Sequence, residues 1–390
     1  MLPRTLEALI SDDLKEKMVF LSGPRQVGKT TVARAVLAKA VAGAYYSWDS
    51  REDRKSILGG VRPPPPALIV LDELHKFRSW KRWLKGEFDK HRTEYEFLVT
   101  GSARLDVYRK GGDSLQGRYH YRRLHPLSMM ELGGQLPQRL PFEPLTFGSY
   151  DSGSEELLHQ LLERGGFPEP FFASTARAQR RWHKERLERF FREDVRELEL
   201  VRDLSSMEML AEILPSRVGS PLSLNALRED LEVTHGAVNH WVDILERMYF
   251  LFRIPPFVAR TVRSLKKEPK AYLWDWSLVT DPGARFENLV ASHLLKLCHH
   301  LEDHEGYRAK LHYLRDRDGR EVDFLVAVDK KPWFMVEAKL DDQAPSRHLH
   351  YFRERLNVPL AYQFIASPGH SFIKNGVHVV SASTALKEIA

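Results

Sequence analysis

The stretch GPRQVGKT, residues 23–30, encloses a short polar loop between two glycines and ends in Lys29 and Thr30. The preceding residues 17–22, KMVFLS, are mostly apolar and typical of a strand. Residues 31–42, TVARAVLAKAVA, are rich in alanine and free of glycine and proline, which favours a helix. A loop between a strand and a helix N-terminus points backbone N–H groups at an anion. The stretch therefore predicts a phosphate-binding loop at the start of an α/β domain.

Each part of this loop has a chemical role. Gly23 and Gly28 let the backbone turn its N–H groups inward, Lys29 reaches the terminal phosphates of a nucleotide, and Thr30 offers a hydroxyl to Mg²⁺. ATP and Mg²⁺ are therefore the expected cofactors. The expected nucleotide-binding residues are Gly23, Pro24, Arg25, Gln26, Val27, Gly28, Lys29, Thr30 and Thr31. The alternative is a degenerate loop that no longer binds a nucleotide.

A second element with acidic residues follows at 67–73, ALIVLDE. It reads as a buried parallel strand whose C-terminal end carries two carboxylates. Asp72 would hold the metal ion through water, together with Thr30, and Glu73 would polarise the attacking water. The alternative is a strand that merely ends in acidic residues.

Two further catalytic roles have candidate residues. Residues 95–100, YEFLVT, predict another buried strand, after which Ser102, or Thr100 at the strand end, would sense the terminal phosphate; a loop serine is equally typical of a plain turn. In LQGR, residues 115–118, Arg118 is placed to act as an arginine finger on the nucleotide of a neighbouring subunit. A surface arginine that pairs with a carboxylate fits the spacing as well.

The order GPRQVGKT, LDELHKFRSW, LVTGSARL, LQGRYHYRRLHPLSMMEL and GGFPEP resembles a bacterial and archaeal group of AAA+ ATPases with a C-terminal appendage. The resemblance implies that Lys29 and Thr30 bind phosphate and Mg²⁺, that Asp72 and Glu73 form the hydrolytic pair, and that Arg118 acts in trans within a homo-oligomer. It also implies that residues 165–170 belong to a helical lid.

Residues 205–275 follow the order of a winged helix-turn-helix. Two helices are expected at 223–233 and 234–248, followed by an apolar, hairpin-like stretch. Residues 253–270 contain six basic residues and one acid, which is typical of a phosphate-binding surface. The expected DNA contacts are Arg260, Arg263, Lys266, Lys267 and Lys270. Because winged helices also bind proteins, a protein partner is the alternative.

The C-terminal part places charged residues on apolar elements. Glu287 lies near the start of a predicted helix (286–295), Asp323 lies in a strand (321–328), and Glu337 and Lys339 share one face of another (333–340). This arrangement resembles the restriction-endonuclease-like PD-(D/E)xK core, with Val322 in place of the proline. The resemblance implies a nuclease-like site of all four residues, with Asp323 and Glu337 as metal ligands. The alternative is a nuclease-derived domain that binds without cutting.

Composition limits the class of protein. The chain has 390 residues, 43% hydrophobic content, 59 basic against 53 acidic residues and one cysteine, Cys298. Without an apolar run of about 18 residues or a signal-peptide pattern, a cytoplasmic protein with no membrane partner is expected. The expected fold class is α/β. The expected domains are a P-loop AAA+ core (1–145), a helical lid (146–204), a winged helix-turn-helix (205–275) and a C-terminal restriction-endonuclease-like α/β domain (276–390).

These parts together predict an ATP-hydrolysing protein that binds and remodels DNA, with branched or junction DNA as an attractive substrate. A nucleotide-dependent switch that acts on a protein partner, with an inactive nuclease-like domain, is the alternative reading of the same architecture.

Overall fold

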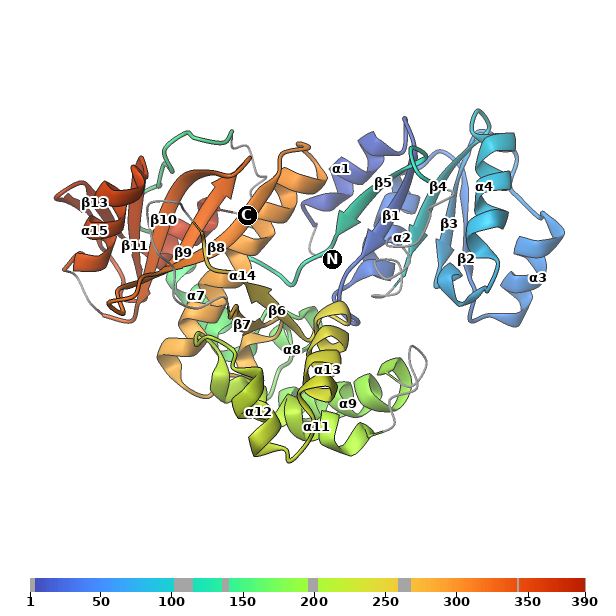
Figure 1. Ribbon diagram of the computed structural model, residues 1–390. Coiled ribbons are helices and arrows are strands. Elements are labelled where there is room, and N and C mark those ends of the chain that lie inside the picture. Colours follow the sequence, from blue (N-terminus) through green and yellow to red (C-terminus); the bar gives the residue numbers. More distant parts are fainter. Residues whose placement is uncertain are drawn as a thin grey trace. The chain divides into compact units, whose positions relative to one another are not determined.

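A computed structural model describes residues 4–101, 115–134, 140–195, 203–258, 268–341 and 344–389 (Figure 1). Internal contacts divide the chain into two compact units. The N-terminal unit contains Met1–His125 and Arg247–Tyr249, and the C-terminal unit contains Pro126–Glu246 and Phe250–Ala390. The four domains expected from the sequence are a finer division, and their boundaries stay a prediction. Among the described helices, none has the length and apolar character needed to span a membrane.

The N-terminal unit is built on a five-stranded parallel sheet with strand order β2-β3-β4-β1-β5. Its strands are β1 (Met18–Ser22), β2 (Gly43–Ser47), β3 (Ala67–Asp72), β4 (Tyr95–Thr100) and β5 (Tyr119–Arg123). Every residue of β1 and β3 is buried, as expected for inner strands of a parallel sheet. Since β4 lies between β1 and β3, the C-terminal ends of these three strands meet at one edge.

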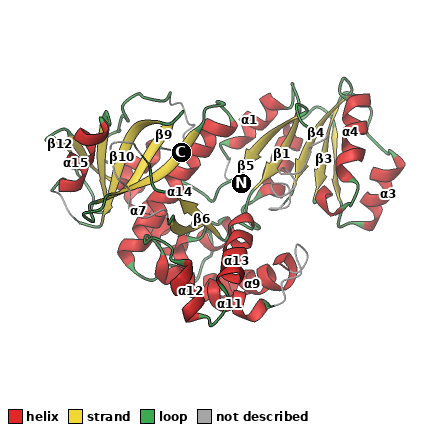
Figure 2. Ribbon diagram, in the orientation of Figure 1, coloured by secondary structure: helices red, strands yellow, loops and turns green. Residues whose placement is uncertain are grey.

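Helices cover this sheet, as Figure 2 shows in red against the yellow strands. They are α1 (Leu6–Asp13), α2 (Lys29–Lys39), α3 (Arg51–Gly59), the 3₁₀ turn η1 (Leu74–Lys76) and α4 (Trp80–His91). One core cluster joins side chains from the sheet, such as Phe20 and Phe97, to Leu84 and Phe88 of α4. Helix α2 begins at Lys29, directly after the loop of residues 23–28.

The first part of the C-terminal unit is mainly helical. Its elements are α6 (Met129–Leu132), α7 (Ser152–Arg164), α8 (Pro168–Phe171), α9 (Ala176–Arg189), the π-helical turn η3 (Phe190–Val195), α11 (Leu204–Ile213), η4 (Leu214–Arg217), α12 (Leu224–Asp230) and α13 (His235–Arg247). Strands β6 (Leu251–Ile254) and β7 (Lys270–Leu273) then pair antiparallel as a two-stranded sheet.

The second part of this unit is built on a six-stranded sheet with the order β12-β13-β11-β10-β9-β8. Its elements are η5 (Trp276–Leu278), α14 (Pro282–Asp303), β8 (Ala309–Arg315), β9 (Glu321–Val328), β10 (Lys331–Lys339), α15 (Arg347–Leu356), β11 (Leu360–Ile365), β12 (Ser371–Lys374), β13 (Val377–Ser381), α16 (Ala382–Ala385) and η6 (Leu386–Glu388). Strands β8, β9 and β10 run antiparallel, whereas β11 is parallel to β10. Helices α14 and α15 both pack against this sheet.

Candidate functional site

The loop between β1 and α2 has the backbone that its glycines predict. Gly23 has φ of 147° and Gly28 has φ of 104°, and a Cβ at Gly23 would overlap the carbonyl oxygen of Leu124. Pro24, Arg25, Gln26 and Val27 complete the loop, and Thr31 lies in the first turn of α2. The buried Lys29 donates to the carbonyl oxygens of Gly23 (2.9 Å) and Pro24 (2.7 Å). Its ammonium group is therefore held inside the loop.

Asp72 accepts hydrogen bonds from several hydroxyl groups at the C-terminal edge of the sheet. Its Oδ2 accepts hydrogen bonds from Thr30 (3.0 Å) and from Tyr45 of β2, and its Oδ1 accepts one from Thr100 of β4. Thr100 and Asp72 are register partners on adjacent strands, which explains their contact. The carboxylate of Asp72 is thus fixed within reach of the phosphate-binding loop.

The donor set around Asp72 fits Mg²⁺. Magnesium prefers carboxylate and hydroxyl oxygens and keeps several waters, so it needs few protein ligands. Thr30 and Asp72 supply these two kinds of oxygen, 3.0 Å apart. The residues present are therefore suited to hold the ion that the loop motif implies.

Glu73 follows Asp72 in a left-handed backbone conformation, with φ of 55°. This conformation ends β3 and turns the chain sharply into η1. Burial raises the pKa of the Glu73 carboxyl group, and the Lys29 and Lys76 charges only partly oppose this effect. Oε2 of Glu73 lies 3.6 Å from both His75 Nε2 and Lys76 Nζ.

The predicted nuclease-like residues come together in the C-terminal unit. Extending the antiparallel register of β9 and β10 places Asp323 opposite Glu337, and Lys339 Nζ lies 2.9 Å from Glu337 Oε1. Glu287 of α14, Glu321 of β9 and Asp323 surround the ammonium group of a lysine from β7. We call Glu287, Glu321, Asp323 and Glu337 the carboxylate cluster.

That lysine is Lys270, which the sequence placed on a DNA-binding surface. Lys270 is only 1% exposed, so this prediction is wrong for its side chain in this structure: it points into the carboxylate cluster. Arg260, Arg263, Lys266 and Lys267 lie outside the described residues, as does Ser102. Their predicted roles stay predictions.

Burial and the proximity of like charges raise the pKa values of two carboxyl groups in this cluster. Burial, reinforced by the charge of Asp323, raises the pKa of Glu287 to about 7 and that of Glu337 to about 8. Burial alone would lower the pKa of Lys270, but the charges of Glu287, Asp323 and Glu321 outweigh it and raise the pKa. Lys270 is therefore a charged ammonium group among acids.

Three family models match successive parts of the chain. Residues 15–133 match the model of an AAA domain. This part of the protein is a P-loop ATPase domain. Residues 155–281 and 282–384 each match a domain of unknown function, DUF8612 and DUF4143. The last two matches meet at residue 281, immediately before α14.

Similar proteins occur in bacteria and archaea. An uncharacterized protein of Mycobacterium tuberculosis is 23% identical over 377 residues, which cover 91% of this chain and 77% of that protein. One from Methanocaldococcus jannaschii is 25% identical over 345 residues, covering 76% and 71%. Among solved structures, a Walker-type ATPase of Pyrococcus abyssi is 13% identical with a TM-score of 0.43, covering 73% of this chain and 96% of that one.

Arg118 lies away from the nucleotide loop of its own AAA domain. It immediately precedes β5, beside Met18 at the start of β1, whereas the nucleotide loop follows the end of β1. Its guanidinium group is partly exposed and bonds Asp89 at 2.6 and 3.0 Å. The structure therefore does not bring Arg118 together with Lys29 and Asp72.

Two residues at the nucleotide site of the AAA domain escaped the sequence analysis. The buried Arg4 donates to the carbonyl oxygens of Val27 (3.0 Å) and His125 (2.5 Å), which ties the loop to the chain after β5. Tyr45 bonds Asp72 from β2. Neither residue is part of a recognisable local motif. Each is distant in sequence from the residues that it bonds, so only the folded chain shows its role.

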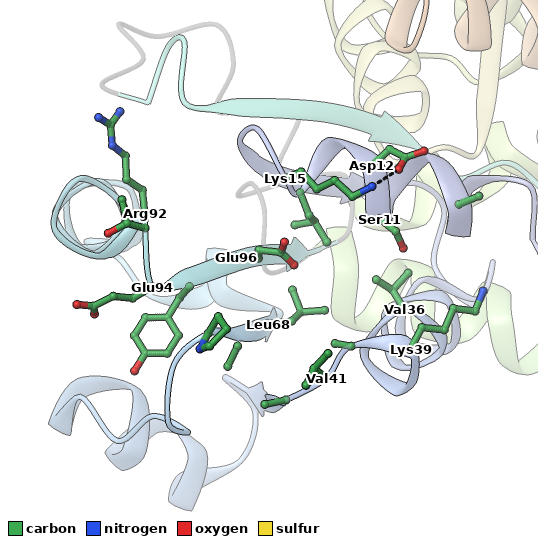
Figure 3. Close-up of a pocket in the computed structure, with 18 residues that line it drawn as sticks. Ser11, Asp12, Lys15, Val36, Lys39, Val41, Leu68, Arg92, Glu94 and Glu96 are labelled. Atoms are coloured by element: carbon green, nitrogen blue, oxygen red, sulfur yellow. Dashed lines mark hydrogen bonds and ion pairs between the residues drawn. The ribbon is translucent and has the colours of Figure 1, made fainter.

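A cavity of about 820 Å³ opens on the AAA domain, but it is not the nucleotide site. Figure 3 shows its lining side chains, which include Lys15, Val41, Leu68 and Glu96. Leu68 and Glu96 lie near the N-terminal ends of β3 and β4, whereas Asp72 and Thr100 end these strands. The cavity and the nucleotide loop therefore lie at opposite edges of the sheet.

Proposed function

We propose that the AAA domain hydrolyses ATP with Mg²⁺ and that this activity drives rearrangement of bound DNA. The proposal of ATP hydrolysis rests on the position of Asp72, whose carboxylate accepts hydrogen bonds from Thr30 at the start of α2 and from Thr100 of the neighbouring strand. Thr30 and Asp72 would hold Mg²⁺, which neutralises phosphate charge when bound. Lys29 would exchange its two carbonyl partners for phosphate oxygens.

Glu73 is the proposed general base, since it directly follows Asp72 and its pKa is raised toward the operating range of a base. Arg118 is the proposed finger for the nucleotide of a second copy of this chain, which makes a homo-oligomer the working form. Its location away from its own nucleotide loop supports action in trans, because a cis role would require it near Lys29.

The DNA half rests on the C-terminal unit. Helices α12 and α13 and the β6-β7 pair follow the order of a winged helix, and the N-terminal half of α13 exposes His235, Asn239 and His240, side chains able to bond base edges. The sequence of residues 259–267 adds four basic residues and no acid. Glu287 lies on α14, Asp323 on β9, and Glu337 and Lys339 on β10, and this arrangement supports a restriction-endonuclease-like domain.

Two measurements test this proposal. Lys29→Ala should abolish steady-state ATP hydrolysis while leaving DNA binding largely intact, because it removes only a phosphate contact. DNA affinity should fall steeply with salt, since contacts of Arg260, Arg263, Lys266 and Lys267 would neutralise several phosphates. Hydrolysis that survives Lys29→Ala would contradict the proposed ATPase site. DNA affinity that is insensitive to salt would contradict the proposed DNA contacts.

A second candidate function is a nucleotide-operated switch that acts on a protein partner. This switch is favoured because two of the six basic residues between 253 and 270 pair with acids of the same chain. Arg253 bonds Asp243 and Glu246, and Lys270 is buried among carboxylates. A slow ATPase rate that DNA leaves unchanged would distinguish this switch from the DNA-dependent protein.

A further inference from the structure

The ammonium group of Lys270 lies at the centre of three acids. Its Nζ is 2.6 Å from Glu321 Oε1, 3.2 Å from Glu287 Oε1 and 3.8 Å from Asp323 Oδ1. These acids come from α14 and β9, whereas Lys270 opens β7 of a different sheet. One cation therefore joins three elements at a site where carboxylates would otherwise repel one another.

The surroundings of Lys270 hold it in place. Its side chain is 1% exposed, and its ammonium lies 5.6 Å from the centre of the Tyr313 ring. The Tyr272 hydroxyl donates to Glu287 Oε1 at 2.6 Å. Gly219 closes the other side of Glu287, where a Cβ would come within 3.0 Å of Oε2. Little room remains in this part of the cluster for an ion with its waters.

The remaining oxygens offer little to a divalent cation. Asp323 Oδ2 accepts the Ala338 N–H at 2.9 Å, and Glu337 Oε1 pairs with Lys339. Among the described residues, Glu337 Oε2 has no hydrogen-bond partner, yet with Lys270 in place no group of three acidic, histidine or cysteine side chains is arranged to hold a metal ion. Hard cations such as Mg²⁺ need a more open set of oxygen ligands than this.

We propose that the Lys270 ammonium takes the place of a divalent cation in the carboxylate cluster, so the C-terminal α/β domain carries a built-in cation instead of a catalytic metal ion. Metal-dependent cutting at this cluster is then excluded. This inference goes beyond the proposed function and depends on neither ATP hydrolysis nor DNA binding.

Removal of the Lys270 ammonium group should allow a divalent cation to bind in the carboxylate cluster. Lys270→Met keeps much of the side-chain volume but leaves buried acids without their counter-charge, a strongly unfavourable state. An added cation would relieve this repulsion by binding where Nζ was. The matched control is Lys339→Met, because Lys339 is partly exposed and bonds Glu337 at the edge of the cluster.

The experiment titrates Mn²⁺ alone into the full-length chain and follows it by electron paramagnetic resonance and by thermal unfolding. Every protein carries Asp72→Asn, which removes the carboxylate ligand of the nucleotide site. The Lys270→Met protein should bind one Mn²⁺ with a dissociation constant below about 1 mM, the weak end for carboxylate sites. The parent and Lys339→Met should show no such binding, and Asp323→Asn should abolish the gain.

Two results would overturn the inference. One is stoichiometric Mn²⁺ binding by the parent that Asp323→Asn removes, because a metal ion would then share the cluster with Lys270. The other is a folded Lys270→Met protein that gains neither Mn²⁺ binding nor Mn²⁺-dependent stabilisation. If Lys270→Met does not fold, the parent and Asp323→Asn proteins still test the inference. Mn²⁺ binding by the parent that is lost in Asp323→Asn contradicts the inference, whereas no Mn²⁺ binding by the parent supports it.

Discussion

Asp72 accepts hydroxyl hydrogen bonds from three elements, and this convergence sets the chemistry of the nucleotide site at the scale of single residues. Asp72 and Thr30 were predicted from their motifs. The choice between Thr100 and Ser102 stayed open, because strand ends look alike in sequence until the register pairs Thr100 with Asp72. Tyr45 was not named from the sequence, and Lys270 was wrongly placed on a DNA-binding surface, since only the folded chain brings these residues to the acids they bond.

Thr100→Val should lower kcat for ATP hydrolysis roughly tenfold or more. The change keeps the shape of the side chain but removes a hydrogen bond to a buried carboxylate, worth about 1.5–3 kcal/mol when the acceptor is charged. ATP binding should change much less, since Thr100 bonds Asp72 rather than the loop. Steady-state kinetics check this, and an unchanged kcat would show that Thr100 has no part in orienting Asp72.

Glu73 should determine the acid side of the pH–rate profile. A general base works only when deprotonated, so the ATPase rate should fall as pH drops through the pKa of Glu73. Because burial raises this pKa, the fall should occur above pH 4.5, the ordinary value of a glutamate. At pH values above the pKa of Glu73, Glu73→Gln should reduce kcat by about 100-fold or more. If a Glu73→Gln protein with residual activity kept the same acid limb of the pH–rate profile, that limb would belong to a group other than Glu73.

At the scale of elements, the sequence located most of the secondary structure around the sites. The strands expected at 17–22, 67–73 and 95–100 coincide with β1, β3 and β4, because their apolar runs suit buried parallel strands. The helices expected at 223–233 and 234–248 match α12 and α13 within a few residues. Strand order, by contrast, depends on crossovers between distant segments, and local patterns do not encode it.

Helix α14 carries a buried histidine that should make stability depend on pH. His293 Nδ1 faces the Leu289 carbonyl oxygen at 2.8 Å and Nε2 accepts the Met129 N–H at 3.1 Å, so the ring is neutral. Burial lowers its pKa to about 4. The unfolded chain, with a pKa near 6.5, therefore binds more protons, and stability is lost as pH falls from 6.5 toward 4, by at most roughly 3 kcal/mol.

Thermal unfolding between pH 7 and pH 4 measures this dependence. His293→Gln should flatten the curve in that window, because glutamine keeps a donor and an acceptor but does not titrate. The exposed His159 provides the control, and His159→Gln should leave the curve as in the unmodified protein. Equal curves for all three proteins would show that His293 does not contribute.

At the scale of the whole molecule, the proposed arginine finger predicts complementation between copies of the chain. Arg118→Ala and Lys29→Ala should each have little ATPase activity alone. In a mixture, an intact Arg118 from one copy can serve an intact nucleotide loop in the next, so activity should reappear. Asp89→Ala is the control, since it frees Arg118 without removing it. A mixture no more active than its components would contradict action in trans.

DNA-dependent ATP hydrolysis is tested by the steady-state ATPase rate of the full chain without nucleic acid and with single-stranded, duplex and four-way-junction DNA. Glu73→Gln is the control for contaminating activity. We expect a Glu73-dependent rate that rises with at least one DNA structure, and that structure is then the preferred substrate. A Glu73-dependent rate that stays the same with every DNA would contradict the DNA-dependent function and favour the protein-directed switch.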